Sequence, residues 1–164
     1  MPGALVALAE RLQGICLGRG LTVALAESCT GGMVAAAITS VPGSSGYFVG
    51  GIISYSDTAK VATLDVAAAA LASHGAVSAQ VAKAMAAGAR TKFDASLTAS
   101  ITGISGPGGG SDAKPLGLTY LGLASGQGVV VRRVTFAGDR DANREAAALA
   151  ALEWLIERAG SEPA

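Results

Sequence analysis

Charged residues, aromatic rings and histidines are all scarce in this sequence, and each shortage removes a class of function. Charged residues make up 15% of the chain and aromatic residues 4%. The 12 basic and 12 acidic residues balance, and no dense block of Lys and Arg suits a nucleic-acid backbone, so no nucleic acid partner is expected. The one histidine, His74, excludes a site with several histidine ligands. Cys16 and Cys29 lack the spacing of a metal site, so no metal is expected.

Long hydrophobic runs are missing as well. Hydrophobic residues make up 51% of the chain, but many are alanine, and no stretch approaches the roughly 20 apolar residues that span a bilayer. The N-terminus lacks the basic region of a signal peptide. We therefore expect a soluble cytoplasmic protein with no membrane partner. Its 164 residues predict a single domain, residues 1–164, that is large enough to bury a core.

Helical and strand patterns alternate along the chain and end with a hairpin and a last helix. This order predicts an α/β fold with a mixed sheet and helices on both faces. A bulge is expected at Gly50 and Gly51. Helices are predicted at 5–17, 30–41, 57–63, 66–73, 78–93 and 139–156, and strands at 21–26, 47–55, 95–102, 116–124 and 129–136.

Residues 26–32 join a predicted buried strand to a predicted helix. They place the side chains of Ser28, Cys29 and Thr30 at the start of that helix. The first N–H groups of a helix lack partners and favour negative charge. Gly31 and Gly32 let a ligand approach the backbone closely. Two interpretations remain open: Ser28 is a nucleophile beside oxyanion donors, or Ser28 or Thr30 caps the helix.

A base for such a nucleophile is either the one histidine, His74, or a residue of another type. Lys60 and Tyr55 follow the strand at 47–55, and a neutral lysine can remove a hydroxyl proton if burial lowers its pKa from about 10.4. The alternative for Lys60 is a solvated surface side chain. Cys29 is either a nucleophile whose pKa is lowered at the helix N-terminus or a small buried side chain.

Two further segments suit an anionic ligand. The glycine-rich residues 103–111 supply backbone N–H groups for a phosphate or a ribose, although they match neither a Walker loop nor a dinucleotide fingerprint. Their alternative is a flexible connection. Arg140 and Arg144 share one helix face and can meet a phosphate or a carboxylate, or else they are solvated surface charges.

Taken together, these segments resemble one family, the CinA C-terminal domain of the nicotinamide-nucleotide amidases (NMN deamidases). Family members often carry a second, N-terminal nucleotide-hydrolase domain, and this chain resembles the stand-alone form. The match extends over nearly the whole chain. The matching segments, in the same order as in the family, are 26–32, 42–45, 54–60, 74–78, 102–107, 114–117 and 138–140.

The resemblance implies a three-layer α/β/α homodimer that hydrolyses the carboxamide of nicotinamide mononucleotide, a small-molecule nucleotide substrate, without a metal or cofactor. It implies Ser28 as nucleophile, Lys60 as base and Tyr55 as an assisting group, which leaves the capping of the helix to Thr30. The residues expected to bind substrate are Thr30, Gly31, Gly32, Thr102, Gly103, Ser105, Gly106, Arg140 and Arg144.

Two positions depart from the family pattern: Asp57 stands where asparagine is common, and Ser105 where alanine is common. A carboxylate beside Lys60 would keep the amine protonated and weaken it as a base. Two rival functions follow. One is a ligand-binding or interaction domain that turns over nothing, which Asp57 would favour, and the other is an amidase for a different small amide.

Overall fold

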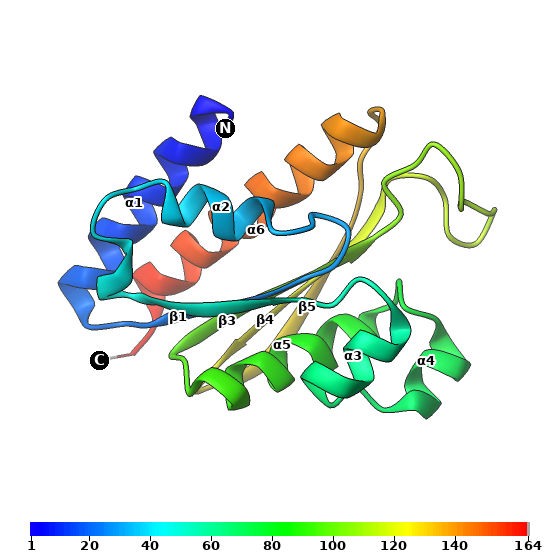
Figure 1. Ribbon diagram of the computed structural model, residues 1–164, viewed down its shortest axis with the longest axis horizontal. Helices are drawn as coiled ribbons and strands as arrows, with labels where there is room; N and C mark the ends of the chain where they lie inside the picture. Colours follow the sequence, from blue (N-terminus) through cyan, green and yellow to red (C-terminus); the bar gives the residue numbers. More distant parts are fainter. Residues whose placement is uncertain (164) are drawn as a thin grey trace.

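The computed structural model describes residues 1–163, which form a five-stranded mixed sheet with the strand order β2-β1-β3-β4-β5 (Figure 1). β1 pairs in parallel with β2 and β3, whereas β4 is antiparallel to β3 and to β5. The strands are β1 (Val23–Glu27), β2 (Phe48–Ile53), β3 (Leu97–Gly103), β4 (Leu118–Ser125) and β5 (Gly128–Thr135).

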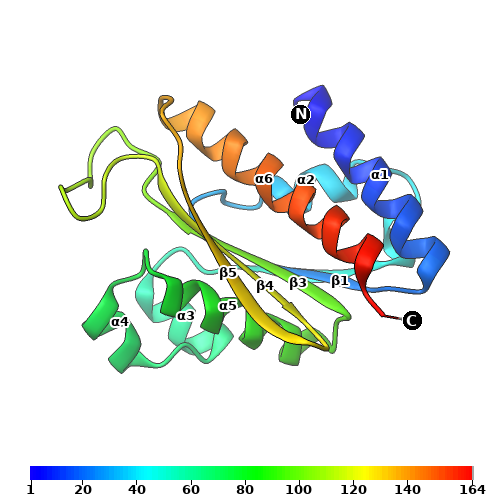
Figure 2. The same cartoon turned by 180° about the vertical axis from the view of Figure 1, so that it is seen from behind.

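Helices cover both faces of this sheet. α1, α2 and α6 lie on one face and α3, α4 and α5 on the other, as the two opposite views show (Figures 1 and 2). The predicted α/β fold with a mixed sheet between two helical layers is therefore confirmed. The helices are α1 (Gly3–Arg19), α2 (Met33–Thr39), α3 (Asp57–Leu64), α4 (Ala68–His74), α5 (Ala79–Phe93) and α6 (Arg140–Ser161), with a short 3-10 turn η1 (Ser44–Gly46) before β2.

Burial differs sharply between the central and the edge strands. Every residue of β1 is buried and all of β3 is buried except Gly103, because helices cover both faces there. β5 alternates between exposed and half-buried residues, as expected for an edge strand. On α6, the buried alanines at 147, 148 and 151 let the helix pack closely on α1 and the sheet.

The carboxyl ends of β1, β2 and β3 lie at the same edge of the sheet because these strands are parallel. Pairing continues one residue beyond β1 and β2. The N–H of Ser54 donates to the carbonyl of Glu27 at 2.9 Å, and that of Ser28 donates to the carbonyl of Ile101 at 2.9 Å. Ser28 and Ser54 therefore stand side by side where the chain leaves the sheet, the usual place for ligands in open α/β folds.

Several predicted bounds differ from the structure. The last helix runs to Ser161 rather than to residue 156, and β2 ends at Ile53 rather than at residue 55. Two further differences have a local physical reason. α2 begins at Met33 rather than at residue 30, because residues 28–32 form a tight turn first. The irregularity in β2 lies one residue before the predicted glycine pair: Val23 is paired with Phe48 and Ala24 with Gly50, which leaves Val49 as the extra residue.

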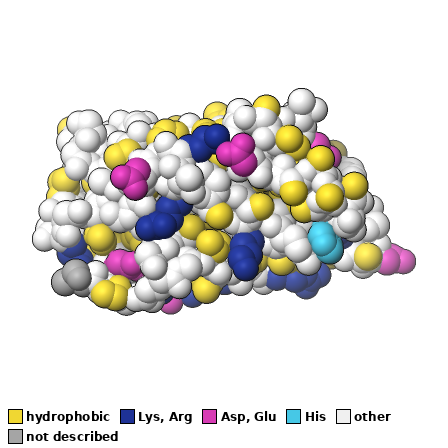
Figure 3. Space-filling view, turned by 90° about the horizontal axis from the view of Figure 1, so that it is seen from below, with side chains coloured by type: hydrophobic (Ala, Val, Ile, Leu, Met, Phe, Trp, Pro, Cys, Tyr) yellow, Lys and Arg dark blue, Asp and Glu magenta, His cyan; other side chains and the backbone are white. Residues whose placement is uncertain are grey.

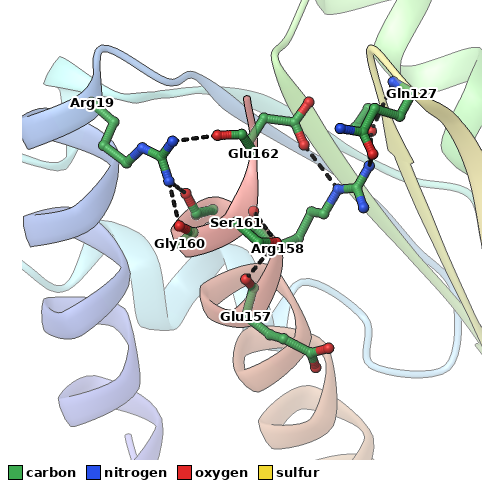
Figure 4. A network of polar contacts seen from close by, with 9 residues as sticks. Arg19, Gln127, Glu157, Arg158, Gly160, Ser161 and Glu162 are labelled. Atoms are coloured by element: carbon green, nitrogen blue, oxygen red, sulfur yellow. Dashed lines mark hydrogen bonds and ion pairs between the residues drawn. The ribbon is translucent and has the colours of Figure 1, made fainter. Parts of the chain in front are cut away.

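A network of polar contacts lies at the C-terminal end of α6, at the end of the sheet away from Ser28 and Ser54 (Figure 4). Arg19 of α1 donates to the carbonyls of Ala159 at 2.7 Å, Gly160 at 2.5 Å and Glu162. Arg158 contacts the Glu162 carboxylate at 2.8 Å and also donates to the β4–β5 turn. Two cations thus satisfy the carbonyls and the carboxylate at this helix C-terminus, where positive charge is favourable.

The surface carries few charges. Figure 3 shows the face formed by α3, α4 and α5, where charged side chains of both signs are scattered among uncharged ones. Of the helices formed by residues 1–163, none is both long enough and apolar enough to cross a membrane.

Candidate active site

Ser28 and Lys60 meet at the carboxyl edge of the parallel strands. The Lys60 Nζ lies 3.1 Å from the Ser28 Oγ, although the two residues are 32 positions apart in the sequence. Both side chains are buried, and Lys60 is only 1% exposed, which is rare for a lysine. The structure therefore brings the predicted nucleophile and the predicted base into hydrogen-bond contact.

Helix α3 positions Lys60. The helix begins after Ser56, whose Oγ accepts a hydrogen bond from the N–H of Ala59 at 3.1 Å. Side chains on a helix lean toward its N-terminus, so the Lys60 side chain runs back toward the end of β2. There its Nζ lies 2.7 Å from the carbonyl oxygen of Ser54 and 3.4 Å from that of Tyr55.

The surroundings of Lys60 favour the neutral amine. Burial lowers the pKa of Lys60 below the ordinary lysine value, and the opposing effect of the Asp57 carboxylate is smaller. Asp57 is exposed in the first turn of α3, where water weakens its influence. A neutral amine has two N–H groups for the two carbonyls and one lone pair for the Ser28 hydroxyl proton. Lys60 is therefore suited to act as a base.

Cys29 lies next to Ser28, in surroundings that disfavour its thiolate. Burial raises the pKa of the Cys29 thiol to about 11, although Arg144 favours the charged form. Only a thiolate is an effective nucleophile, so the alternative of Cys29 as a nucleophile with a lowered pKa does not fit the structure. The alternative interpretation of Cys29 as a small buried side chain fits the structure, since it is 8% exposed and packs in the main hydrophobic core.

Glu27 occupies the N-terminal donors of α2. Its buried carboxylate accepts hydrogen bonds from the N–H groups of Gly32 at 3.0 Å, Val34 at 3.3 Å and Ala35 at 2.9 Å. A negative charge is favourable at a helix N-terminus, and the protein supplies this one itself. These three N–H groups are consequently not free to bind a substrate anion.

Thr30 does not cap α2, contrary to the prediction. Gly32 stands at the N-cap position with a φ of 96° and has no side chain to cap the helix, so the side-chain hydrogen bonds at this helix start come from Glu27. Within residues 1–163 the buried Thr30 Oγ1 has no hydrogen-bond partner, and the backbone N–H of Thr30 finds no acceptor. The N–H of Gly31 donates to the carbonyl of Ser28 at 3.0 Å. Thr30 thus offers an unused backbone donor two residues from the hydroxyl of Ser28.

Arg144 reaches this turn from α6. Its Nε donates to the carbonyl of Cys29 at 3.0 Å, and one terminal nitrogen donates to the carbonyl of Thr30 at 3.2 Å. The carboxylate of Asp141 is 3.8 Å away and almost fully exposed. The guanidinium expected to bind substrate phosphate therefore already binds two backbone carbonyls of the Ser28 turn.

Arg140, one turn earlier, connects two other segments. Its terminal nitrogens donate to the carbonyl of Gly106 at 2.6 Å and to the hydroxyl of Tyr55 at 3.1 Å. The Tyr55 side chain is 61% exposed, and Tyr55 contacts Lys60 through its carbonyl rather than its hydroxyl. Arg140 and Tyr55 thus form the solvent side of the site, and an assisting role for the phenol stays a prediction.

The end of β3 packs directly against the Ser28 turn. A Cβ on Gly103 would lie 3.2 Å from the Cys29 Sγ and 2.7 Å from the Thr119 hydroxyl, so only glycine fits without displacement. The buried hydroxyl of Thr102 donates to the carbonyl of Ala76 at 2.9 Å and is therefore occupied. Both residues shape the wall of the site, and their binding of substrate stays a prediction.

Helix α6 also holds the glycine-rich connection between β3 and β4. Asn143 donates to the carbonyl of Ser105 at 3.0 Å, next to the Arg140 contact with Gly106. An open hollow of about 510 Å³ lies over the outer part of this connection, lined by residues 107–112, Pro115 and Leu116. None of the lining residues belongs to the Ser28–Lys60 pair, so the outer loop is separate from the reacting groups.

Two residues of the site had no role in the sequence prediction. Glu27 holds the start of α2, and the carbonyl of Ser54 binds the Lys60 amine. Glu27 carried a signal, because a lone carboxylate at the end of an otherwise apolar strand must find donors when it is buried. Ser54 carried none, since its contact uses a backbone atom.

The comparison with known families identifies the family of this chain. The family model of the CinA C-terminal domain matches residues 5–159. This chain belongs to the CinA family. A CinA-like protein of Geobacter sulfurreducens is 54% identical over 140 residues, which are 85% of this chain and 34% of the relative. A CinA-like protein of Citrifermentans bemidjiense is 51% identical over 146 residues, 89% of this chain and 35% of the relative.

Solved structures share the fold of this CinA-family domain. The competence/damage inducible protein CihA of Agrobacterium tumefaciens has a TM-score of 0.93 and 40% identity, with 96% of each chain covered. A CinA superfamily protein of Enterobacter cloacae has a TM-score of 0.89 and 31% identity, with 94% of this chain and 92% of that chain covered. The chain spans about a third of the length of the curated relatives, and their names state family membership, so the chemistry has to be inferred from the site.

Proposed function

We propose that this CinA-family domain is an amidase that converts nicotinamide mononucleotide to nicotinate mononucleotide and ammonia. The observation that carries the proposal is the 3.1 Å contact between the Ser28 hydroxyl and the buried Lys60 amine, whose pKa is lowered. The resemblance of residues 26–32 and 54–60 to the nicotinamide-nucleotide amidases supplies the substrate.

In the first half of the proposed reaction, the Ser28 Oγ attacks the carboxamide carbon while neutral Lys60 takes the hydroxyl proton. The carbonyl oxygen becomes an oxyanion, and the N–H groups of Cys29 and Thr30, which find no acceptor among residues 1–163, are the candidate donors. One such donor is worth about 3 kcal/mol of transition-state stabilisation. The Gly31 N–H is less suited than expected, because it already donates to Ser28.

In the second half, protonated Lys60 gives its proton to the departing amine, and ammonia leaves. Water then attacks the acyl group on Ser28, with Lys60 again taking a proton and returning it to the Ser28 oxygen. The sum is one amide bond hydrolysed and one water consumed. Three oxygen neighbours surround Lys60, namely Ser28 Oγ and the carbonyls of Ser54 and Tyr55, and they also accept the three N–H groups of the protonated amine.

Arg140 is the better candidate for the phosphate of the nucleotide. It is exposed at the solvent side of the site, and its contacts with Gly106 and Tyr55 leave further N–H groups free for an anion. Arg144 is less suitable, because binding a phosphate would compete with its two backbone carbonyls.

The test is ammonia release from nicotinamide mononucleotide and from a panel of other small carboxamides. We expect the wild-type domain to hydrolyse the nucleotide and the Ser28→Ala and Lys60→Ala variants to lose that activity. Turnover of other amides but not of the nucleotide would support an amidase with a different substrate. Binding of the nucleotide without any turnover would support a non-catalytic domain, and full activity in Ser28→Ala would exclude the mechanism.

A further inference from the structure

Arg144 makes contacts that suit a role other than substrate binding. Its guanidinium joins two consecutive carbonyls, those of Cys29 and Thr30, in the turn that follows the nucleophile. The side chain is 28% exposed and comes from α6, far from this turn in the sequence. An arginine fork that binds two backbone acceptors fixes their direction more strictly than a single bond does.

The direction of these carbonyls determines the direction of two N–H groups. Both peptide bonds are trans, and in a planar trans peptide the C=O of one residue and the N–H of the next point in opposite directions. Because the carbonyls of Cys29 and Thr30 face Arg144, the N–H groups of Thr30 and Gly31 face away from it. The Gly31 N–H ends on the carbonyl of Ser28, so this side of the turn faces the backbone of the residue that carries the nucleophile.

Of the two N–H groups whose direction Arg144 sets, that of Thr30 is the one without an acceptor, and the N–H of Cys29, in a peptide that Arg144 does not contact, is also without one among residues 1–163. Glu27 occupies the donors at the start of α2. A cation on the carbonyl side of a peptide also polarises it, so that its N–H becomes a stronger donor. These two effects make Arg144 responsible for both the direction and the strength of one free donor.

We propose that Arg144 is a positioning residue that orients the Thr30 N–H toward the oxyanion formed when Ser28 attacks its substrate. The proposal rests on the proposed acyl transfer at Ser28 and does not depend on which amide is the substrate. It assigns different roles to two arginines on one face of α6: Arg140 faces the ligand, and Arg144 holds the catalytic turn.

The experiment compares Arg144→Gln with Arg140→Gln on nicotinamide mononucleotide and on nicotinamide riboside, which lacks the phosphate. For Arg144→Gln we expect kcat to fall about 10–100-fold by the same factor on both substrates, with KM nearly unchanged, because a misdirected donor loses part of an effect worth 10²–10³-fold. For Arg140→Gln we expect KM to rise mainly on the nucleotide. A rise in KM of Arg144→Gln on the nucleotide alone would make Arg144 a phosphate ligand and overturn the proposal.

Arg144→Lys keeps the charge but cannot bridge two carbonyls, so we expect most of the loss in kcat to persist in this variant. Full activity in Arg144→Lys would show that orientation is unimportant and would contradict the proposal. This variant also provides a second measurement if Arg144→Gln unfolds, which thermal unfolding of each variant reveals.

A probe independent of the amide substrate separates this proposal from the proposed function. A fluorophosphonate reacts with an activated serine, losing fluoride as the serine oxygen bonds to phosphorus, and its phosphoryl oxygen occupies the oxyanion position. We expect intact-mass measurements to show Ser28 labelling in the wild type and about 10–100-fold slower labelling in Arg144→Gln. Slower labelling without any amide turnover would retain the Arg144 role and reject the amidase, whereas equal labelling rates would reject the Arg144 role.

Discussion

The two ends of α6 differ in whether the polar groups beside them have hydrogen-bond partners within the protein. At its C-terminal end, each polar contact of Arg158 is made with another part of the protein: the Glu162 carboxylate at 2.8 Å, the Ser125 hydroxyl at 2.7 Å and the Gln127 side chain at 2.8 Å (Figure 4). Arg19 satisfies the last carbonyls of the helix from α1. This end is closed, because its charges already have protein partners.

The N-terminal end of α6 borders groups that lack such partners. Within the described residues, the buried hydroxyls of Thr30 and Ser54 have no hydrogen-bond partner, and the Thr30 N–H has no acceptor. Lys60 is a buried amine whose neighbours are carbonyls and a hydroxyl rather than a carboxylate. Unsatisfied buried groups cost free energy, and those beside the Ser28–Lys60 pair are candidates for contacts with a ligand. Four further buried side-chain atoms without a partner, those of Gln13, Tyr47, Arg90 and Thr98, lie elsewhere among the described residues. The comparison therefore predicts that changes at one end affect activity and changes at the other affect stability.

The largest effect is expected for Ser28→Ala. Loss of the nucleophile should lower kcat/KM for the amide by about 10⁴-fold or more, while the free energy of unfolding stays within about 0.5 kcal/mol. Ammonia release and chemical denaturation measure the two quantities. Ser40→Ala, at the end of α2, is the matched control and should leave both unchanged. A large loss of stability in Ser28→Ala would mean that this end also holds the fold.

Lys60→Met should lower kcat by about 10²–10⁴-fold, the usual contribution of a general base. It should also remove a pH dependence of stability. The pKa of Lys60 in the folded protein lies below its unfolded value of 10.5, so between these values the unfolded chain binds more protons. The free energy of unfolding of the wild type should therefore rise relative to Lys60→Met as pH increases through this window. Denaturation at several pH values tests the sign, and an opposite slope would mean that the folded protein holds Lys60 charged.

Arg158→Ala tests the closed end of α6. It leaves the Glu162 carboxylate, which is 9% exposed, without its cation, and we expect a loss of about 1–3 kcal/mol in the free energy of unfolding with kcat and KM unchanged. Glu157→Gln is the control, because its ion pair with Arg132 is exposed and should contribute less than about 1 kcal/mol. Loss of activity without loss of stability in Arg158→Ala would contradict the division between the two ends.

The sequence predicted the elements of both ends but only part of their contacts. The alternation of helices and strands determined the fold class, and the caps at Ser56, Ser78 and Asp139 follow from residue preferences at helix starts. The Ser28–Lys60 pair was available only through the resemblance, since no local pattern shows that residues 32 positions apart touch. The role of Arg144 depends on backbone carbonyls, which every residue carries, so no side-chain pattern could indicate it.

The smallest effect is expected for Asp57→Asn, at the solvent side of the open end. The Asp57 carboxylate raises the pKa of Lys60, against the larger lowering by burial. Removing the carboxylate should lower the pKa of Lys60 further, so that the amine becomes neutral at lower pH. The acidic limb of kcat/KM should then move to lower pH, and the difference from wild type should shrink as salt is added, because Asp57 is exposed.

Glu10→Gln is the control for this last prediction, since it removes one exposed carboxylate from α1, on the other face of the sheet. Its pH profile should coincide with that of the wild type. A shift of the acidic limb to higher pH in Asp57→Asn would mean that the carboxylate assists the base through another contact. No shift at low salt would assign the limb to a group other than Lys60. In either case the negative charge of Asp57 would no longer support the rival interpretation of a domain that binds a ligand without turnover.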